Sequence, residues 1–253
     1  MNSDFTMRTS LIIGAEGIEK LKNSHILVIG VGGVGSYCVE SLVRAGVGHI
    51  TIVDYANVEE SDFNRQLPGL ISNLNKSKVE VMKERLLDIN KNLDIKAINC
   101  IFNEESSKEI FNNKYDYIVD AIDMVSAKIH LIEQSIKNNI PIISSMGMGN
   151  KLDPTKIEVS DISKTHTCPL AKIMRKELRN RGIETLKVVF STEEPLEVKE
   201  KISNGHRILP GSMSFMSSVG GLIISSQVVR DMLFNKKIVI ILNEKLLLFF
   251  YCK

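Results

Sequence analysis

Residues able to bind a nucleotide stand directly after two apolar runs near the start of the chain. The first run, 26–29, is followed by closely spaced glycines, and the second, 50–53, is closed by an acid: Gly30, Gly32, Gly33, Gly35 and Asp54. Such glycines let backbone N–H groups approach phosphate oxygens at the start of a helix, and the acid can accept hydrogen bonds from ribose. We expect a βαβ nucleotide-binding unit over residues 25–54, the alternative being a glycine turn that only packs a helix on a sheet.

Cations and further carboxylates follow the same pattern of strand ends. They stand after the second apolar run, at the start of a helical pattern at 77–87, and after the apolar run 117–119: Asn64, Arg65, Lys78, Asp120 and Asp123. Two cations with an extra acid suit a triphosphate and Mg²⁺, whereas NAD needs neither. This set favours attack of a carboxylate on the α-phosphorus of ATP, with Asp123 as the candidate metal ligand. Taken alone, Lys78 would be a solvated lysine, and either acid would cap the next helix.

The composition is that of an ordinary globular protein. The 253 residues are 43% hydrophobic and 25% charged, with a net charge of +2, which gives no general nucleic-acid signature. The four cysteines include no C-x-x-C pair, and the first ten residues contain no apolar signal core. These features predict a cytoplasmic protein without a disulfide framework or a zinc knuckle.

The order of patterns predicts a single α/β domain. We expect a Rossmann-like doubly wound sheet, parallel in its first half, with a nucleotide-binding half at 1–150 and a C-terminal α+β extension on the substrate side at 151–253. Further strands are expected at 95–101, 141–145, 156–159 and 188–190, and helices at 15–22, 104–111 and 127–138. The weakly apolar, serine-containing segment 211–232 predicts a buried helix in preference to a membrane span.

A basic run crosses the second half of the chain between residues 172 and 187. Its members that we assign to a polyanion-binding surface are Lys172, Arg175, Lys176 and Arg179. A solvated helical face is the ordinary explanation of such a run, and phosphate contacts with RNA are the more specific one. The apolar tail at 238–251 suggests a hairpin without an assigned function.

The chain resembles the ubiquitin-activating-enzyme-like adenylyltransferases. Glycines 30–35, Asp54, the stretch 64–66, Lys78 and the stretch 120–123 match that family's ATP motifs in order and spacing. The resemblance implies that Asp54 holds ribose, that Arg65 and Lys78 grip phosphates, and that Asp123 serves the metal or the adenine. It also implies a homodimer in which Arg8 reaches the ATP of the other subunit. Asp62 departs from the pattern, since relatives often carry asparagine there.

Within that superfamily the chain is most similar to the tRNA threonylcarbamoyladenosine dehydratases. Residues 8–14, 120–123, 152–157 and 169–171 carry this resemblance. It implies ATP-dependent cyclisation of the threonylcarbamoyl side chain in tRNA through adenylation of its carboxylate. The sequence does not decide whether the protein also uses a monovalent cation or a protein partner from a sulfurtransferase system.

Activation of a ubiquitin-like sulfur carrier is the alternative function. Enzymes of that class commonly carry two C-x-x-C pairs, which this sequence lacks, and Cys168 is the one loop candidate for an acceptor thiol. We expect a structural role for this cysteine, because an intramolecular cyclisation needs no protein thiol. A nucleotide sensor and an NAD enzyme are further alternatives, but neither would need Arg65, Lys78 and Asp123 together.

Overall fold

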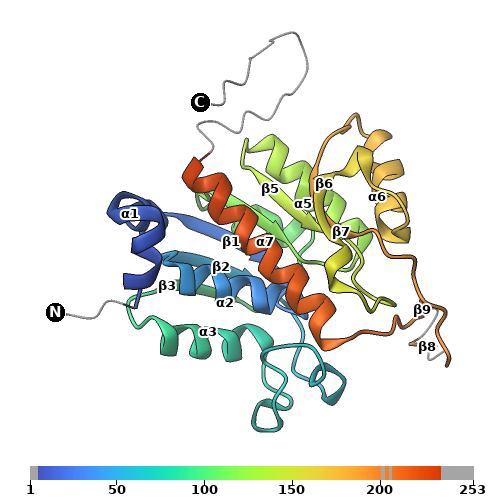
Figure 1. Ribbon diagram of the computed structural model, residues 1–253, viewed down its shortest axis with the longest axis horizontal. Helices are drawn as coiled ribbons and strands as arrows, with labels where there is room; N and C mark the ends of the chain where they lie inside the picture. The colour runs from blue at the N-terminus through green and yellow to red at the C-terminus, as the bar shows by residue number, and fades with distance from the viewer. Residues whose placement is uncertain (1–4, 201–202, 205–206, 235–253) are drawn as a thin grey trace.

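The computed structural model describes residues 5–200, 203–204 and 207–234. Its main sheet has seven strands in the order β3-β2-β1-β4-β5-β7-β6 (Figure 1). The strands are β1 (His25–Ile29), β2 (His49–Val53), β3 (Asp94–Ile98), β4 (Tyr117–Asp120), β5 (Ile142–Ser145), β6 (Ile157–Asp161) and β7 (Lys187–Ser191). Every pairing is parallel except that of β6 with β7. The predicted fold class, a doubly wound sheet with a C-terminal extension, is confirmed.

The strand order reverses between β1 and β4. From β1 the chain runs outward through β2 to β3 and then returns to β4 on the other side of β1. Open parallel sheets bind ligands at the carboxyl ends of the strands where the order reverses in this way. The glycine motif and the acids 120–123 follow these two strands and therefore share one edge.

Helices cover both faces of the sheet. They are α1 (Met7–Lys22), α2 (Gly35–Ala45), α3 (Lys78–Ile89), α4 (Glu104–Ile110), α5 (Val125–Lys137), α6 (Pro169–Arg179) and α7 (Ser214–Phe234). Figure 1 shows α2, α3 and α7 in front of the sheet, with α7 running beside α2. A short hairpin, β8 (Ser203–Asn204) with β9 (Arg207–Ile208), precedes α7. Short 3₁₀ turns lie at η1 (Glu60–Asp62), η2 (Ile71–Asn73), η3 (Pro154–Lys156) and η4 (Ile162–Lys164).

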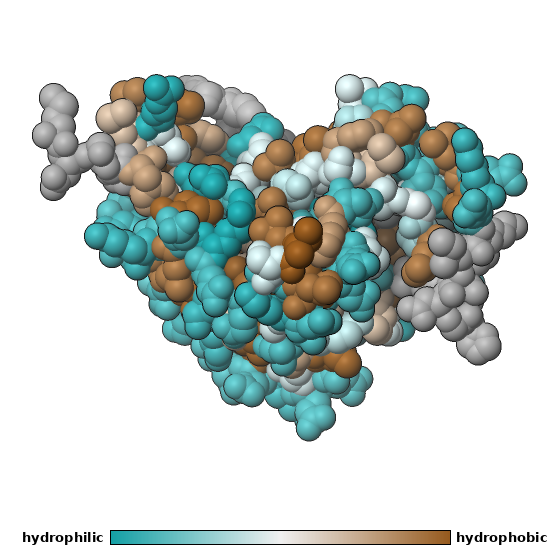
Figure 2. Space-filling view, turned by 90° about the horizontal axis from the view of Figure 1, so that it is seen from below, coloured by the Kyte–Doolittle hydropathy of each residue, from teal (hydrophilic) through white to brown (hydrophobic). Residues whose placement is uncertain are grey.

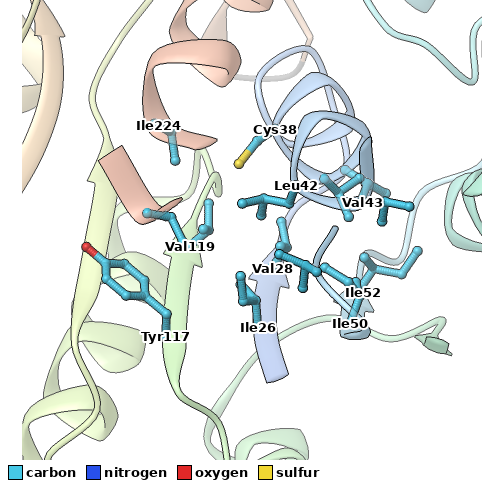
Figure 3. Packing of buried hydrophobic residues seen from close by; sticks show 14 of the residues in the cluster. Ile26, Val28, Cys38, Leu42, Val43, Ile50, Ile52, Tyr117, Val119 and Ile224 are labelled. Carbon is cyan, nitrogen blue, oxygen red and sulfur yellow. The ribbon is translucent and has the colours of Figure 1, made fainter. Parts of the chain in front are cut away.

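Successive side chains of a strand point to opposite faces of the sheet and pack in two separate core layers. Ile26 and Val28 of β1 pack in the cluster that includes α2 and α7, whereas Leu27 and Ile29 pack in the cluster that includes α4 and α5. Figure 3 shows the first cluster, where Ile224 of α7 lies near α2. A strand buried on both faces is apolar throughout, which explains the unbroken β-branched runs in the sequence.

Helix α7 packs closely against α2 because small residues of α7 lie at the contact. A Cβ atom at Gly221 would lie only 2.3 Å from the carbonyl oxygen of Val34. The hydroxyls of Ser225 and Ser41 are hydrogen-bonded across the same contact at 2.8 Å. The glycines and serines of 211–232 thus serve close helix packing, and no helix in the described part of the chain is long and apolar enough to cross a membrane.

A few element boundaries differ from those expected. Helix α1 begins at Met7 rather than at 15, with a break at Gly14, whose φ of 73° favours glycine. Strand β3 ends at Ile98 instead of 101. The hairpin expected at 238–251 lies outside the described residues.

Candidate nucleotide site

The glycine motif forms a tight turn between β1 and α2. Gly30 has φ of 89°, and a Cβ atom there would lie 2.7 Å from the carbonyl oxygen of Ala121 after β4. A Cβ atom at Gly35 would lie 1.8 Å from the carbonyl oxygen of Gly30. Both positions therefore require glycine, and the turn brings the start of α2 against the end of β4. Gly32 and Gly33 lie between them and are half-buried.

The start of α2 is open to an anion. Its N-cap residue, Val34, makes no side-chain capping hydrogen bond. Backbone N–H groups at a helix start carry partial positive charge and bind phosphate when no side chain caps them. The buried Oε1 atom of Gln66, near Gly32, also has no hydrogen-bond partner in the described structure. An open helix start and an orphaned polar atom beside the glycines fit a bound phosphate chain.

Asp54, the predicted ribose ligand, holds the backbone of the glycine turn. Its Oδ2 accepts a hydrogen bond from the backbone N–H of Val31 at 2.8 Å, and its Oδ1 accepts one from Ala56 at 2.9 Å. The carboxylate is half-buried at the end of β2, beside the glycine turn. Since carboxylate oxygens have further lone pairs, this position is compatible with ribose hydroxyls as additional donors.

Asp62 brings the two predicted cations together. Its side chain is almost fully buried, and its Oδ2 lies 2.9 Å from Nζ of Lys78 while its Oδ1 lies 3.7 Å from the guanidinium of Arg65. The same carboxylate accepts hydrogen bonds from Gln66 Nε2 and from the backbone N–H of Glu59. One buried anion on the loop after β2 thus anchors both Arg65, on the same loop, and Lys78, at the start of α3.

The expectation that Lys78 alone would be a solvated lysine is wrong. Lys78 is only 8% exposed. Its charge is unfavourable at the positive end of the α3 dipole, and the carboxylate of Asp62 on the preceding loop compensates for this. Arg65 lies close to the glycine turn, with its Cγ 3.4 Å from where a Cβ of Gly33 would stand. Asp62, a departure in the sequence pattern, is therefore a structural centre of the site that sequence reasoning left without a role.

Asn64 ties this loop to the C-terminal extension. Its Nδ2 donates to the carbonyl oxygen of Ser212, just before α7, at 3.0 Å. Its Oδ1 accepts a hydrogen bond from Arg65 at 2.9 Å. The loop after β2 and the start of α7 therefore enclose the glycine turn together.

Asp120 lies beneath the site rather than on its surface. It is fully buried and pairs with Nζ of Lys128, also fully buried, at 2.9 Å. Its carboxylate further accepts hydrogen bonds from the Ser144 hydroxyl and the Ile122 backbone N–H. These protein partners engage its carboxylate, so Asp120 supports the loop 121–123 where a direct contact with the nucleotide was expected. No pattern in the sequence indicates the role of Lys128, which is set by tertiary packing.

Asp123 is exposed at the same sheet edge, directly before α5. Within the described residues no group of three or more His, Cys, Asp or Glu side chains is arranged to hold a metal ion. Mg²⁺ at nucleotide sites is commonly held by one or two carboxylates together with the substrate phosphates. A single carboxylate close to the glycine turn is compatible with that mode of binding.

Comparison with known proteins assigns the family. A model of the ThiF family matches residues 6–233. A tRNA threonylcarbamoyladenosine dehydratase of Bacillus subtilis (strain 168) is 44% identical over 237 residues, which cover 89% of this chain and 93% of the relative. The chain belongs to the ThiF family, among its tRNA threonylcarbamoyladenosine dehydratases. The resemblance predicted from the sequence is confirmed.

A solved relative of this ThiF-family protein carries the same fold with nucleotide bound. The Escherichia coli tRNA N6-threonylcarbamoyladenosine dehydratase in complex with ATP superposes with a TM-score of 0.81 at 30% identity, covering 89% of this chain and 92% of that one. A molybdopterin-synthase adenylyltransferase of Haemophilus influenzae is 36% identical over 129 residues, which cover only 51% of this chain. The sulfur-carrier alternative therefore rests on a more distant likeness.

The basic run of this ThiF-family protein is divided by the geometry of α6. Lys172, Lys176 and Arg179 are exposed at helical spacing, so they share one face. Arg175 is half-buried and donates to both the carbonyl oxygen and the hydroxyl of Thr165, at 2.7 and 2.6 Å. Arg175 thus holds the loop before α6, and its guanidinium is engaged where a phosphate contact was expected.

Arg8 lies away from the glycine turn, and Cys168 is buried. Arg8 is exposed near the start of α1, two residues after Thr6, which packs beside Gly46 at the far end of α2. An eleven-residue helix spans about 16 Å, so Arg8 does not start near its own chain's phosphate site. Cys168 is 2% exposed and packs among apolar residues of α6 and β7, which agrees with the expected structural role.

Proposed function

We propose that this protein adenylates the carboxylate of threonylcarbamoyladenosine in tRNA and cyclises the side chain, with loss of one water from the nucleoside. The observation that carries the proposal is the pair Arg65 and Lys78, held by Asp62 beside an open helix start. This arrangement suits the binding of a polyphosphate, whereas an enzyme that transfers hydride from NAD does not require it. Family membership supplies the substrate class, and tRNA as substrate implies a cytoplasmic enzyme.

The first step is attack of the substrate carboxylate on the α-phosphorus of ATP. An O–P bond forms, the bond to the β-phosphate breaks, and pyrophosphate leaves with its electron pair. Backbone N–H groups at the start of α2 bind phosphate oxygens, and Arg65 and Lys78 neutralise the charge that builds on them. Asp54 orients the nucleotide through its ribose. These cations act without reorganising because the buried carboxylate of Asp62 already fixes their positions.

In the second step an internal nucleophile of the threonylcarbamoyl group attacks the acyl-adenylate. Its bond to the acyl carbon closes the ring, its proton is lost, and AMP departs with the former carboxylate oxygen. The overall change is ATP to AMP and pyrophosphate, with one water removed from the nucleoside. Asp123 would hold Mg²⁺, which supplies charge neutralisation for the departing pyrophosphate when bound.

The tRNA surface that we propose is the exposed face of α6. Lys172, Lys176 and Arg179 supply three positive charges there, whereas Arg175 supports the fold of that surface through Thr165. Contacts of this kind bind the phosphate backbone in a salt-dependent way without reading the sequence.

We also propose a homodimer in which Arg8 of one subunit completes the ATP site of the other. Apolar side chains stand exposed around Arg8 on α1, with Leu11 at 82% and Ile12 at 86% exposure, and Met7 also exposed. Figure 2 shows apolar side chains set among hydrophilic ones at the end of the molecule where α1 lies. Apolar surface of this kind on a helix end is favourable to bury against a second copy.

The proposed reaction is tested by mass spectrometry of nucleosides from tRNA that carries the linear threonylcarbamoyladenosine. With ATP and Mg²⁺ the protein should remove one water from that nucleoside, and Lys78→Ala should abolish the change. Lys83→Ala, on the same helix, is the matched control and should retain activity. An unchanged nucleoside, together with ATP–pyrophosphate exchange that requires a ubiquitin-like carrier, would refute the proposal and establish the alternative substrate.

A further inference from the structure

The hydroxyl of Ser217 is buried without a partner. Ser217 lies in the first turn of α7 and is 4% exposed, and its Oγ atom makes no hydrogen bond within the described structure. Its neighbours on the same helix behave differently: Ser218 donates to the carbonyl oxygen of Phe215, and Ser225 donates to that of Leu222. A helical serine can make this local bond, and Ser217 is a buried serine of α7 whose hydroxyl does not make it.

The orphaned hydroxyl borders the glycine turn. If Gly33 carried a Cβ atom, that atom would lie 2.9 Å from Oγ of Ser217 and 3.4 Å from Cγ of Arg65. The close packing of α7 on the start of α2, through Gly221, brings Ser217 to this position. Ser217 and Arg65 therefore approach the same side of the turn from different elements.

One of the other buried polar atoms without a partner also borders the turn. Within the described residues these other atoms are Oε1 of Gln66, beside Gly32, and Oγ of Ser77, directly before Lys78. Burying a polar group without a partner destabilises the folded state, and native proteins keep few such groups. Two orphaned atoms that border one turn, those of Ser217 and Gln66, indicate a ligand that supplies their partners.

We propose that Ser217 donates a hydrogen bond to a phosphate oxygen of the nucleotide bound at the glycine turn. The inference deepens the proposed function and rests on its ATP site. A hydroxyl at this position is matched to a phosphate, because phosphate oxygens accept hydrogen bonds and the start of α2 attracts their charge. The C-terminal extension thereby contributes a binding residue to the site built by the first half of the chain.

The test measures ATP affinity and thermal stability of the full chain for the wild type, Ser217→Ala and Ser218→Ala. Loss of a hydrogen bond to a charged acceptor should weaken ATP binding by Ser217→Ala about ten-fold or more, measured by calorimetry. Without nucleotide its melting temperature should be equal to or above that of the wild type, since the alanine removes an unpaired hydroxyl. Adenosine, which lacks phosphates, should protect both proteins equally, and Ser218→Ala should bind ATP as the wild type does.

Unchanged ATP affinity in Ser217→Ala would overturn the inference. So would an equal loss of adenosine protection, or a lower melting temperature without nucleotide that accounts for the weaker binding. Absence of ATP binding by the wild type would refute the proposed function itself, and the inference with it. Normal ATP binding by the wild type with no effect of Ser217→Ala would remove only the inference.

Discussion

Replacing Lys128 by methionine should destabilise the protein strongly while leaving its surface unchanged. Lys128 and Asp120 are both fully buried, and the ammonium also donates to the carbonyl oxygens of Ile122 and Ser145. Methionine has a similar length and no charge. The carboxylate of Asp120 would then stay buried with only the Ser144 hydroxyl and one backbone N–H as donors.

The magnitude follows from this burial. Removing one partner of a buried ion pair costs about 3–5 kcal/mol, because an uncompensated charge stays in the interior. For a chain of this size that corresponds to a fall in melting temperature of roughly 6–20 °C. Arg44→Met is the matched control. Arg44 pairs with Glu40 at the surface with 56% of its side chain exposed, and its loss should cost at most about 1 kcal/mol.

Urea unfolding followed by circular dichroism measures the free energies, and a double-mutant cycle isolates the pair. Asp120→Asn combined with Lys128→Met removes both charges and should cost less than the sum of the single changes. The reasoning would be refuted if Lys128→Met cost no more than about 1 kcal/mol, as an exposed pair does. Strict additivity in the cycle would refute it as well.

Three further predictions concern the assembly, the substrate surface and the response to pH. Arg8→Ala and Lys78→Ala should each be inactive alone, yet a mixture refolded together should regain about a quarter of the activity, since half of random dimers are mixed and each restores one of two sites. No recovery would contradict donation of Arg8 across the dimer. Charge reversal of the exposed basic residues of α6 should weaken tRNA binding in filter assays. The slope of log affinity against log salt concentration should fall by an amount equivalent to roughly three phosphate contacts, whereas Lys91→Glu should change neither quantity. Burial, and next the nearby His49, lower the pKa of His25 below 6.5, so its neutral form is favoured in the folded state. The unfolded chain therefore takes up the proton first, and the stability of the fold should fall as pH drops below 6.5. The melting temperature of His25→Asn should depend less on pH in this range. The same dependence on pH in the wild type and the variant would contradict this assignment.

The nucleotide half could be predicted from the sequence because its signals are local. Gly30 must be glycine since its φ is positive, and Gly35 since its Cβ would meet the backbone of the same turn. The acid Asp54 follows a β-branched strand at a spacing fixed by one βαβ unit. Each of these requirements acts within about thirty residues of chain, so composition and spacing reveal it.

The roles of Asp62, Lys128 and Ser217 were decided by tertiary contacts. Asp62 anchors Lys78 only because the loop after β2 folds against the start of α3. Lys128 reads as an ordinary helix lysine until β4 and β5 enclose it, and Ser217 meets the glycine turn from a helix nearly two hundred residues later. Arg175 likewise looks like its basic neighbours in sequence and differs from them by facing Thr165. The sequence by itself determined which residues can bind phosphate, since glycine and charge act locally, and the packing of distant elements decided which of them face the nucleotide and which hold the others in place.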